Sequence, residues 1–304
     1  MKKTIITAII AAASISAVSQ TFSYGDLRYR ITGKTTVSVS ADDPKMSGNV
    51  AIPERIMQDS VIYTVTSVER KGFADCKGIS SIVLPARISS IGDSAFAGCE
   101  NLNTINIPYA VKEIKGNTFE NCRFLTGITV PDGVKSIGNS AFSYCERLIR
   151  FIVPDECISI GDNAFYGCSR MQAFAVNSKL EKIGNSALGR CIGIVRFQVE
   201  QGNPNFICVD EALVWKTGGK TIFLKYPSKR RETSYRMPDD VTEVAEYAFE
   251  DVESLALVQL NGKCEALRDY AFFSCTSLQK ITRPEGHVDI TEDSIFGCPL
   301  LTFY

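Results

Sequence analysis

The chain of 304 residues carries 33 lysines and arginines against 34 aspartates and glutamates, which leaves a net charge of −1. This near-neutral balance provides no broad basic surface and argues against nonspecific binding to nucleic acid or to an anionic membrane. The sequence contains one histidine, His287, so its inventory for acid–base chemistry is thin.

The first 19 residues are typical of a secretory signal peptide. Lys2 and Lys3 form a short positive region, residues 4–18 are apolar and small, and Ala17 with Ser19 fits a small-x-small cleavage site. No later segment approaches the roughly 18 apolar residues that a membrane span requires. We therefore expect an exported protein, secreted or held at the cell surface, with no membrane span.

From residue 65 to residue 304 the chain repeats with a period of 23 residues, and residues 20–64 precede the first unit as an N-terminal cap. Phe73 and Cys76, for example, recur as Phe96 and Cys99. A fixed period of this length indicates stacked supersecondary units, each too small to bury its own apolar face. Regular repeats occupy residues 65–202 and 241–304. The eight complete units begin at Val65, Ile88, Val111, Val134, Cys157, Leu180, Val241 and Cys264.

Each unit combines two local patterns. In the unit that begins at Ile88, residues 102–107 have the apolar, β-favouring character of a short strand, which Pro108 ends. Residues 92–99 open with glycine and a polar residue and then place alanine beside phenylalanine, which we interpret as a capped helical turn. We therefore predict an α/β solenoid with one short parallel strand and one short helical turn per unit.

Seven positions of the unit are apolar in most copies and are predicted to form the core. They are positions one, four, nine, twelve, fifteen, eighteen and twenty.

The units resemble those of the BspA-like leucine-rich repeat family of bacterial surface and secreted proteins, whose repeat carries an IGxxAFxxC core followed by a leucine, an isoleucine and a strand-ending proline. The match runs from Val65 to Phe303, and residues 29–40, 48–53 and 63–68 are similar to the family's N-terminal cap. The resemblance implies a right-handed leucine-rich-repeat solenoid and a role in adhesion or extracellular recognition, including host-directed recognition. It implies no catalytic residues.

The strict period breaks in residues 203–240. Residues 221–227 and 233–238 both have the strand-and-proline pattern of a unit, and Gly218 with Gly219 predicts a β-hairpin turn in place of the helical half. The family shows similar hairpin-bearing long repeats, so we expect the solenoid to continue through this insertion.

Two aromatic residues of the insertion, Trp215 and Phe223, are candidate contact residues. Exposed on the hairpin they would stack on a sugar ring, and the alternative is that they pack within the hairpin.

Eleven cysteines in an exported chain raise the question of a disulfide framework. Eight of them share position twelve, so their side chains point the same way on successive units. A disulfide needs facing Cβ atoms about 3.8 Å apart, whereas parallel strands stack at about 4.8 Å. Val252 takes the position in one unit, so a plain hydrophobe is sufficient there. We expect buried free thiols, with one or two local bridges as the alternative.

The motifs of enzymes and metal sites are missing from the sequence. There is no CxxC pair for zinc and no GxSxG elbow for a nucleophile, and the adjacent acidic pairs such as Asp42–Asp43, Asp239–Asp240 and Glu250–Asp251 fall in turn-like places. We therefore predict no enzyme, no cofactor, and no catalytic or metal-binding residues.

A binding surface is predicted on the strands of the fourth to sixth units. In a continuous sheet, positions sixteen, seventeen and nineteen face its open side, where apolar residues lie between two arginines, as in protein-contact surfaces. Solvent-facing strand residues without a partner are the alternative. The candidate residues are Ile149, Arg150, Ile152, Ala173, Ala175, Val195, Arg196 and Gln198.

These observations favour a non-catalytic protein-recognition or adhesion module. The expected partner is an extracellular protein, from a host matrix or a bacterial surface. A glycan-binding surface protein and a passive spacer in a surface assembly are the alternatives, and the oligomeric state stays open.

Overall fold

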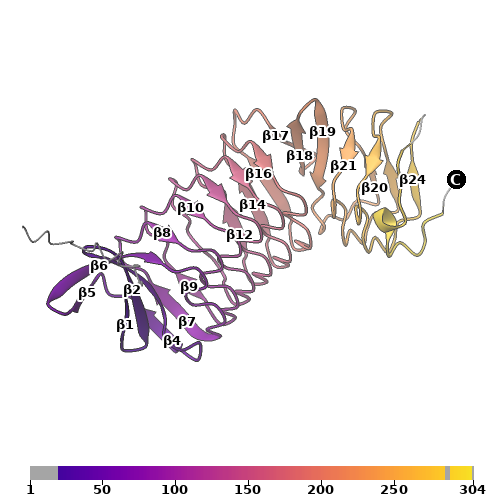
Figure 1. Cartoon of the computed structure of the whole chain (residues 1–304). Coiled ribbons are helices and arrows are strands. Elements are labelled where there is room, and N and C mark those ends of the chain that lie inside the picture. The colour runs from indigo at the N-terminus through magenta and orange to yellow at the C-terminus, as the bar shows by residue number, and fades with distance from the viewer. Residues whose placement is uncertain (1–19, 285–287, 303–304) are drawn as a thin grey trace, which may run out of the picture.

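The computed structural model describes residues 20–284 and 288–302. It is a β-solenoid whose units stack side by side as rungs, from the cap sheet to the last strand (Figure 1). The predicted solenoid is thus confirmed. The signal peptide expected in residues 1–19, and also His287, lie outside the described residues.

The N-terminal segment forms a sheet with the strand order β1-β2-β3-β6-β5. In β2, buried Leu27 and Tyr29 alternate with exposed Arg28 and Arg30, as expected of a strand with one face on the core. β3 and β6 are parallel, and β6 continues into the solenoid by pairing in parallel with β8 (Ser90–Ile91). The bounds are β1 Thr21–Tyr24, β2 Leu27–Gly33, β3 Thr36–Ala41, β4 Ser47–Ala51, β5 Arg55–Gln58 and β6 Val61–Val68.

Seven of the eight complete rungs contribute two short parallel strands, where the sequence predicted one, and the rung that begins at Val111 contributes one, Glu113–Ile114. The additional strands lie at positions three and four, and their partners are one period apart, as in Ser136 opposite Ser159. This first ladder comprises β8, β10 (Glu113–Ile114), β11 (Ser136–Ile137), β13 (Ser159–Ile160), β15 (Lys182–Ile183), β21 (Glu243–Val244) and β23 (Ala266–Leu267). The second ladder, around positions seventeen to nineteen, comprises β7 (Gly78–Val83), β9 (Thr104–Ile105), β12 (Arg150–Ile152), β14 (Ala173–Val176), β16 (Arg196–Val199), β20 (Ser234–Arg236), β22 (Leu257–Gln259) and β24 (Lys280–Thr282).

The predicted helical turn is wrong, and the α/β class with it. The Ala95 N–H bonds within its own rung, to Gly92, whereas the N–H groups of Ser94 and Phe96 donate to the next rung. An α-helix would take all these donors internally. Ser94 and Gly98 also have positive φ angles of 55° and 74°, which interrupt a right-handed helix. Among the described residues the one helical element is the 3₁₀ turn η1 (Asp293–Ile295), so the fold is built from strands and turns.

The core consists of the predicted columns. All seven core positions of the rung that begins at Ile88 are buried. From Phe73 to Phe165, position nine forms a continuous ladder of phenylalanines, in which the rings of Phe96 and Phe119 are stacked with centroids 5.5 Å apart. This offset stacking adds to the burial of each ring, so neighbouring rungs stabilise one another.

The cysteines at position twelve form a second ladder. The Cys99 thiol donates to the Phe73 carbonyl at 3.0 Å, and the Cys122 thiol donates to the Phe96 carbonyl at 3.2 Å. All eleven cysteines of the chain carry free thiols, and seven of the eight at position twelve are buried. The prediction of buried free thiols is therefore confirmed. The sequence had not indicated the hydrogen bond to the preceding rung that seven of the eight thiols at position twelve make.

The irregular segment contains the predicted hairpin, but one of its strands joins a different ladder from the one that the sequence predicted. β17 (Phe206–Val209), β18 (Ala212–Thr217) and β19 (Lys220–Lys225) are antiparallel, and Gly218 and Gly219 turn with positive φ angles of 55° and 80°. β20 joins the second ladder as expected. β19 joins the first ladder instead, because Ile222 lies opposite Glu243.

Candidate protein-binding surface

The exposed side chains of β12, β14 and β16 form one surface, here called the central sheet face. The three strands are parallel and in register, so Arg150, Ala173 and Arg196 form one row. Ile152, Ala175 and Gln198 form the next row. The row between them is Phe151, Phe174 and Phe197, which point into the core and are buried.

The central sheet face combines exposed apolar groups with two cations. Ile149, Ile152 and Val195 are 47%, 66% and 45% exposed. Among the described residues the ion pairs involve other arginines, and neither Arg150 nor Arg196 takes part in one. Both guanidinium groups are therefore available to a ligand.

The structure brings the eight residues predicted for this surface together. Six of them lie in the two rows just described, and Ile149 and Val195 directly precede β12 and β16. Strand spacing of about 4.8 Å places the two arginine Cα atoms about 10 Å apart, on either side of Ala173. Short side chains between long ones leave room for a ligand group between the arginines.

The two aromatic candidates of the hairpin do not form an exposed pair. Phe223 is fully buried and stacks on Phe249, with ring centroids 4.9 Å apart. The Trp215 ring is half-buried on Phe206, and its Nε1–H donates to the Glu181 carbonyl at 3.0 Å. Packing is therefore the role of Phe223, and the expectation that it lies exposed on the hairpin is wrong.

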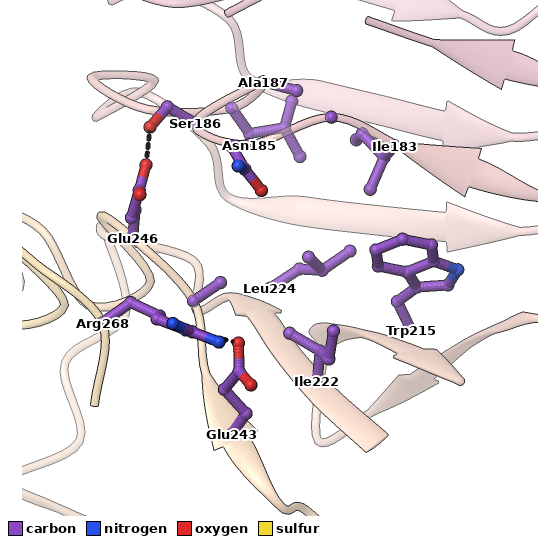
Figure 2. A pocket seen from close by; sticks show the side chains of 13 residues that line it. Ile183, Asn185, Ser186, Ala187, Trp215, Ile222, Leu224, Glu243, Glu246 and Arg268 are labelled. Atoms are coloured by element: carbon purple, nitrogen blue, oxygen red, sulfur yellow. Dashed lines mark hydrogen bonds and ion pairs between the residues drawn. The ribbon is translucent and has the colours of Figure 1, made fainter. Parts of the chain in front are cut away.

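Sequence reasoning missed a cavity of about 220 Å³ between the sixth rung (180–202) and the seventh (241–263), here called the junction pocket. Figure 2 shows Trp215, Ile222 and Leu224 at its apolar end, with Asn185 and Ser186 of the sixth rung facing Glu246, Arg268 and Glu243. Only a shortened rung creates this space: two residues, Leu224 and Lys225, connect Phe223 at position four to Tyr226 at position nine, where a regular rung has four. No local sequence signal marks this shortening.

Ion pairs stabilise the polar side of the junction pocket. The Arg268 Nε lies 2.6 Å from the Glu243 carboxylate, and the Lys220 Nζ lies 3.2 Å from it. Burial acts to raise the pKa of Glu243, but the hydrogen bonds from Arg268 and Lys220 outweigh it, so this pKa lies below its ordinary value. The Ser186 hydroxyl donates to the Glu246 carboxylate.

Comparison with known protein families identifies the repeat that forms these columns and ladders. The model of the BspA type leucine rich repeat region matches residues 66–195 and 228–304, in six copies. The chain belongs to this family.

Solved structures share the fold. A leucine rich cell surface protein from Faecalibacterium prausnitzii is 22% identical, with a TM-score of 0.73 over 93% of this chain and 87% of that one. The pneumococcal vaccine antigen PcpA is 23% identical, with a TM-score of 0.74 over 87% and 70% of the two chains. A leucine-rich repeat protein from Bacteroides ovatus is 22% identical, with a TM-score of 0.56 over 86% and 76%. No curated protein sequence matches the chain significantly.

The structure gives each residue of the BspA-type motif a physical role. A Cβ on Gly92 would lie 2.4 Å from the Arg70 nitrogen of the preceding rung, so glycine is needed for close stacking. Ala95 is fully buried beside Phe96, and Cys99 ties its rung to the one before. The motif therefore codes for stacking of rungs and leaves the exposed faces free to vary.

Within the residues that the structure describes, no helix has the length and apolar character needed to cross a membrane. In the same residues, no three histidine, cysteine, aspartate or glutamate side chains gather in a way that could hold a metal ion.

Proposed function

We propose that this BspA-type repeat protein is an exported, non-catalytic recognition module that binds an extracellular protein through its central sheet face. The observation that carries the proposal is the row Arg150, Ala173, Arg196, with exposed Ile149, Ile152 and Val195 beside it. Protein interfaces are enriched in arginine, and their apolar centres supply most of the binding energy.

The geometry supports a protein ligand for a further reason. The backbone under this face is fixed by parallel pairing in three strands and by buried Phe151, Phe174 and Phe197. A surface held in this way loses little conformational entropy on binding, which favours affinity. The proposal includes export through the expected signal peptide of residues 1–19 and a place at the bacterial surface, as the name of the Faecalibacterium relative records for that protein.

The test is binding of residues 20–304 to a panel of extracellular-matrix proteins, mucins and polysaccharides. The Arg150→Glu, Arg196→Glu double variant should lose at least about 2 kcal/mol, or about thirtyfold in Kd, for a protein partner. The matched control is Lys135→Glu, Lys182→Glu, which makes the same change in charge. Both lysines are exposed; Lys182 lies in β15 of the first ladder, and Lys135 directly precedes β11.

Each alternative has its own outcome. Binding to a protein that both double variants retain would move the contact surface elsewhere on the solenoid. Binding to polysaccharide alone, abolished by Trp215→Ala, would establish a glycan-binding protein. The absence of any binding across the panel would favour the passive spacer.

A further inference from the structure

The junction pocket lies where one rung lacks part of its turn. In the regular rungs, the N–H of position nine donates to the carbonyl of position eight in the next rung, as from Phe165 to Ala187 at 2.9 Å. The same bond runs from Tyr226 to Ala248 at 2.8 Å and from Phe249 to Ala271 at 2.7 Å. Leu188 holds position nine of the sixth rung, and its N–H makes no hydrogen bond with any described residue.

Neighbouring donors show the same interruption. In most rungs the N–H of position seven donates to the next rung, as from Lys71 to Asp93 at 2.9 Å, whereas the Ser186 and Tyr247 N–H groups at this position make no such bond to another described residue. The Arg190 N–H, at position eleven, reaches past the shortened rung to the Glu250 carboxylate at 2.6 Å. Since Leu188 is only 5% exposed, its unpaired N–H is costly unless something else accepts from it.

The pocket has two chemically different ends. Trp215, Ile222 and Leu224 line the apolar end, and Ser186 and Glu246 lie at the polar end (Figure 2). Two carboxylates, Glu243 and Glu246, against one guanidinium, that of Arg268, give the lining a charge of 1 − 2 = −1. This charge disfavours phosphate and carboxylate ligands.

We propose that the junction pocket binds a short, uncharged peptide segment of a partner protein. A carbonyl of the segment accepts from the Leu188 N–H, as the next rung does elsewhere, and an adjacent apolar side chain lies against Trp215 and Ile222. The mode is that of strand addition, in which main-chain hydrogen bonds supply affinity and a pocket for one side chain supplies specificity. The volume of about 220 Å³ is below the range of about 300–1,000 Å³ usual for drug-sized ligands, and this size suits one side chain with its peptide group.

This inference rests on the proposed function in that both assign a protein ligand, but it concerns a separate surface. The probe is the capped tripeptide acetyl-glycyl-leucyl-glycinamide, titrated to about 10 mM, since a ligand of this size binds in the millimolar range. Trp215, the one tryptophan of the chain, reports binding through its fluorescence. Amide hydrogen exchange followed by NMR reports on the Leu188 N–H.

We expect a saturable change in the fluorescence of Trp215. At a tripeptide concentration of about ten times the Kd, hydrogen exchange of the Leu188 N–H should slow about tenfold. Ala245→Leu, which fills the pocket, should abolish both effects. Ile222→Ala should weaken binding about tenfold while leaving the pocket open, and thus serves if the larger side chain disturbs folding. Ala256→Leu is the matched control, a half-buried alanine of the same rung outside the pocket.

Three results would overturn the proposal: no saturable change, a change that Ala245→Leu and Ile222→Ala both leave intact, or binding of chitotriose in place of the peptide. The Arg150→Glu, Arg196→Glu variant should bind the tripeptide as the parent chain does. Failure of the peptide assay and failure of the central sheet face are therefore separately visible.

Discussion

The ammonium group of Lys225 lies 3.4 Å from the carboxylate of Glu250, and the two side chains are 1% and 3% exposed. Lys225 also donates to the Tyr247 carbonyl at 2.7 Å, while Glu250 accepts from the Arg190 N–H. Buried charges persist where they are paired and hydrogen-bonded. This pair therefore joins the hairpin, the sixth rung and the seventh rung at one point.

Glu250→Gln should lower the free energy of unfolding by about 3–5 kcal/mol, because it leaves the Lys225 ammonium buried without a countercharge. Urea denaturation measures this. The Lys225→Met, Glu250→Gln double variant removes the stranded charge and should be more stable than the single variant. A single variant as stable as the parent chain would contradict the buried pair.

Gly138→Ala should destabilise the solenoid by about 1–3 kcal/mol, because the added Cβ would lie 2.6 Å from the backbone nitrogen of Gly116. Thermal unfolding of the two forms gives the comparison. Gly127→Ala is the control, since nothing lies within 4 Å of its Cβ. Equal losses in the two variants would show that stacking distance is not the cause.

Cys298 should be the thiol that iodoacetamide modifies first. It is only partly buried, and its interaction with the neighbouring Cys275 thiol lowers its pKa, so more of it is thiolate at neutral pH, whereas desolvation raises the pKa of the more exposed Cys208. Burial raises the pKa of Cys76 to about 11 and that of Cys122 well above its ordinary value. Mass spectrometry after increasing labelling times gives the order in which the thiols are modified. Early modification of Cys122 would contradict the closed core.

Stability should fall in acid partly through Glu243. Its folded pKa is depressed, so its contribution is present above the unfolded pKa of about 4.3 and is lost as pH falls through the folded value. Glu243→Gln should therefore be less stable than the parent chain at pH 7, by about 1 kcal/mol since Arg268 is half-exposed, and the difference should vanish in strong acid. Urea denaturation across pH measures this, and Arg268→Gln should show the same loss. Parallel curves for parent and variant would contradict the assignment.

Much of the central sheet face could be predicted because the strand period is local. Arg150 and Arg196 differ by two whole periods, and parallel stacking places equivalent positions in one row. Phe223 shows the limit of this reasoning, since its exposure depends on which ladder β19 joins. That choice follows from pairing with β21, which no pattern within residues 221–227 reveals.

The turn segment shows the same limit at the level of secondary structure. Gly92, Ala95 and Phe96 have the composition of a capped helical turn, yet every second N–H there donates to the next rung. Local preference is a weak prior when the neighbouring rung offers equal hydrogen bonds, and tertiary contact then decides the backbone conformation.

The sequence by itself determined that this protein is a stack of 23-residue units, which columns form the core, and which strand residues of the regular units face outward, because the period of burial follows from residue type. Only the tertiary structure decided that turns replace helices, that a second ladder exists, and that the junction pocket opens between Ser186 and Glu246, sixty residues apart. Each of these follows from hydrogen bonds and contacts between rungs, which depend on stacking distance and on the length of one irregular rung.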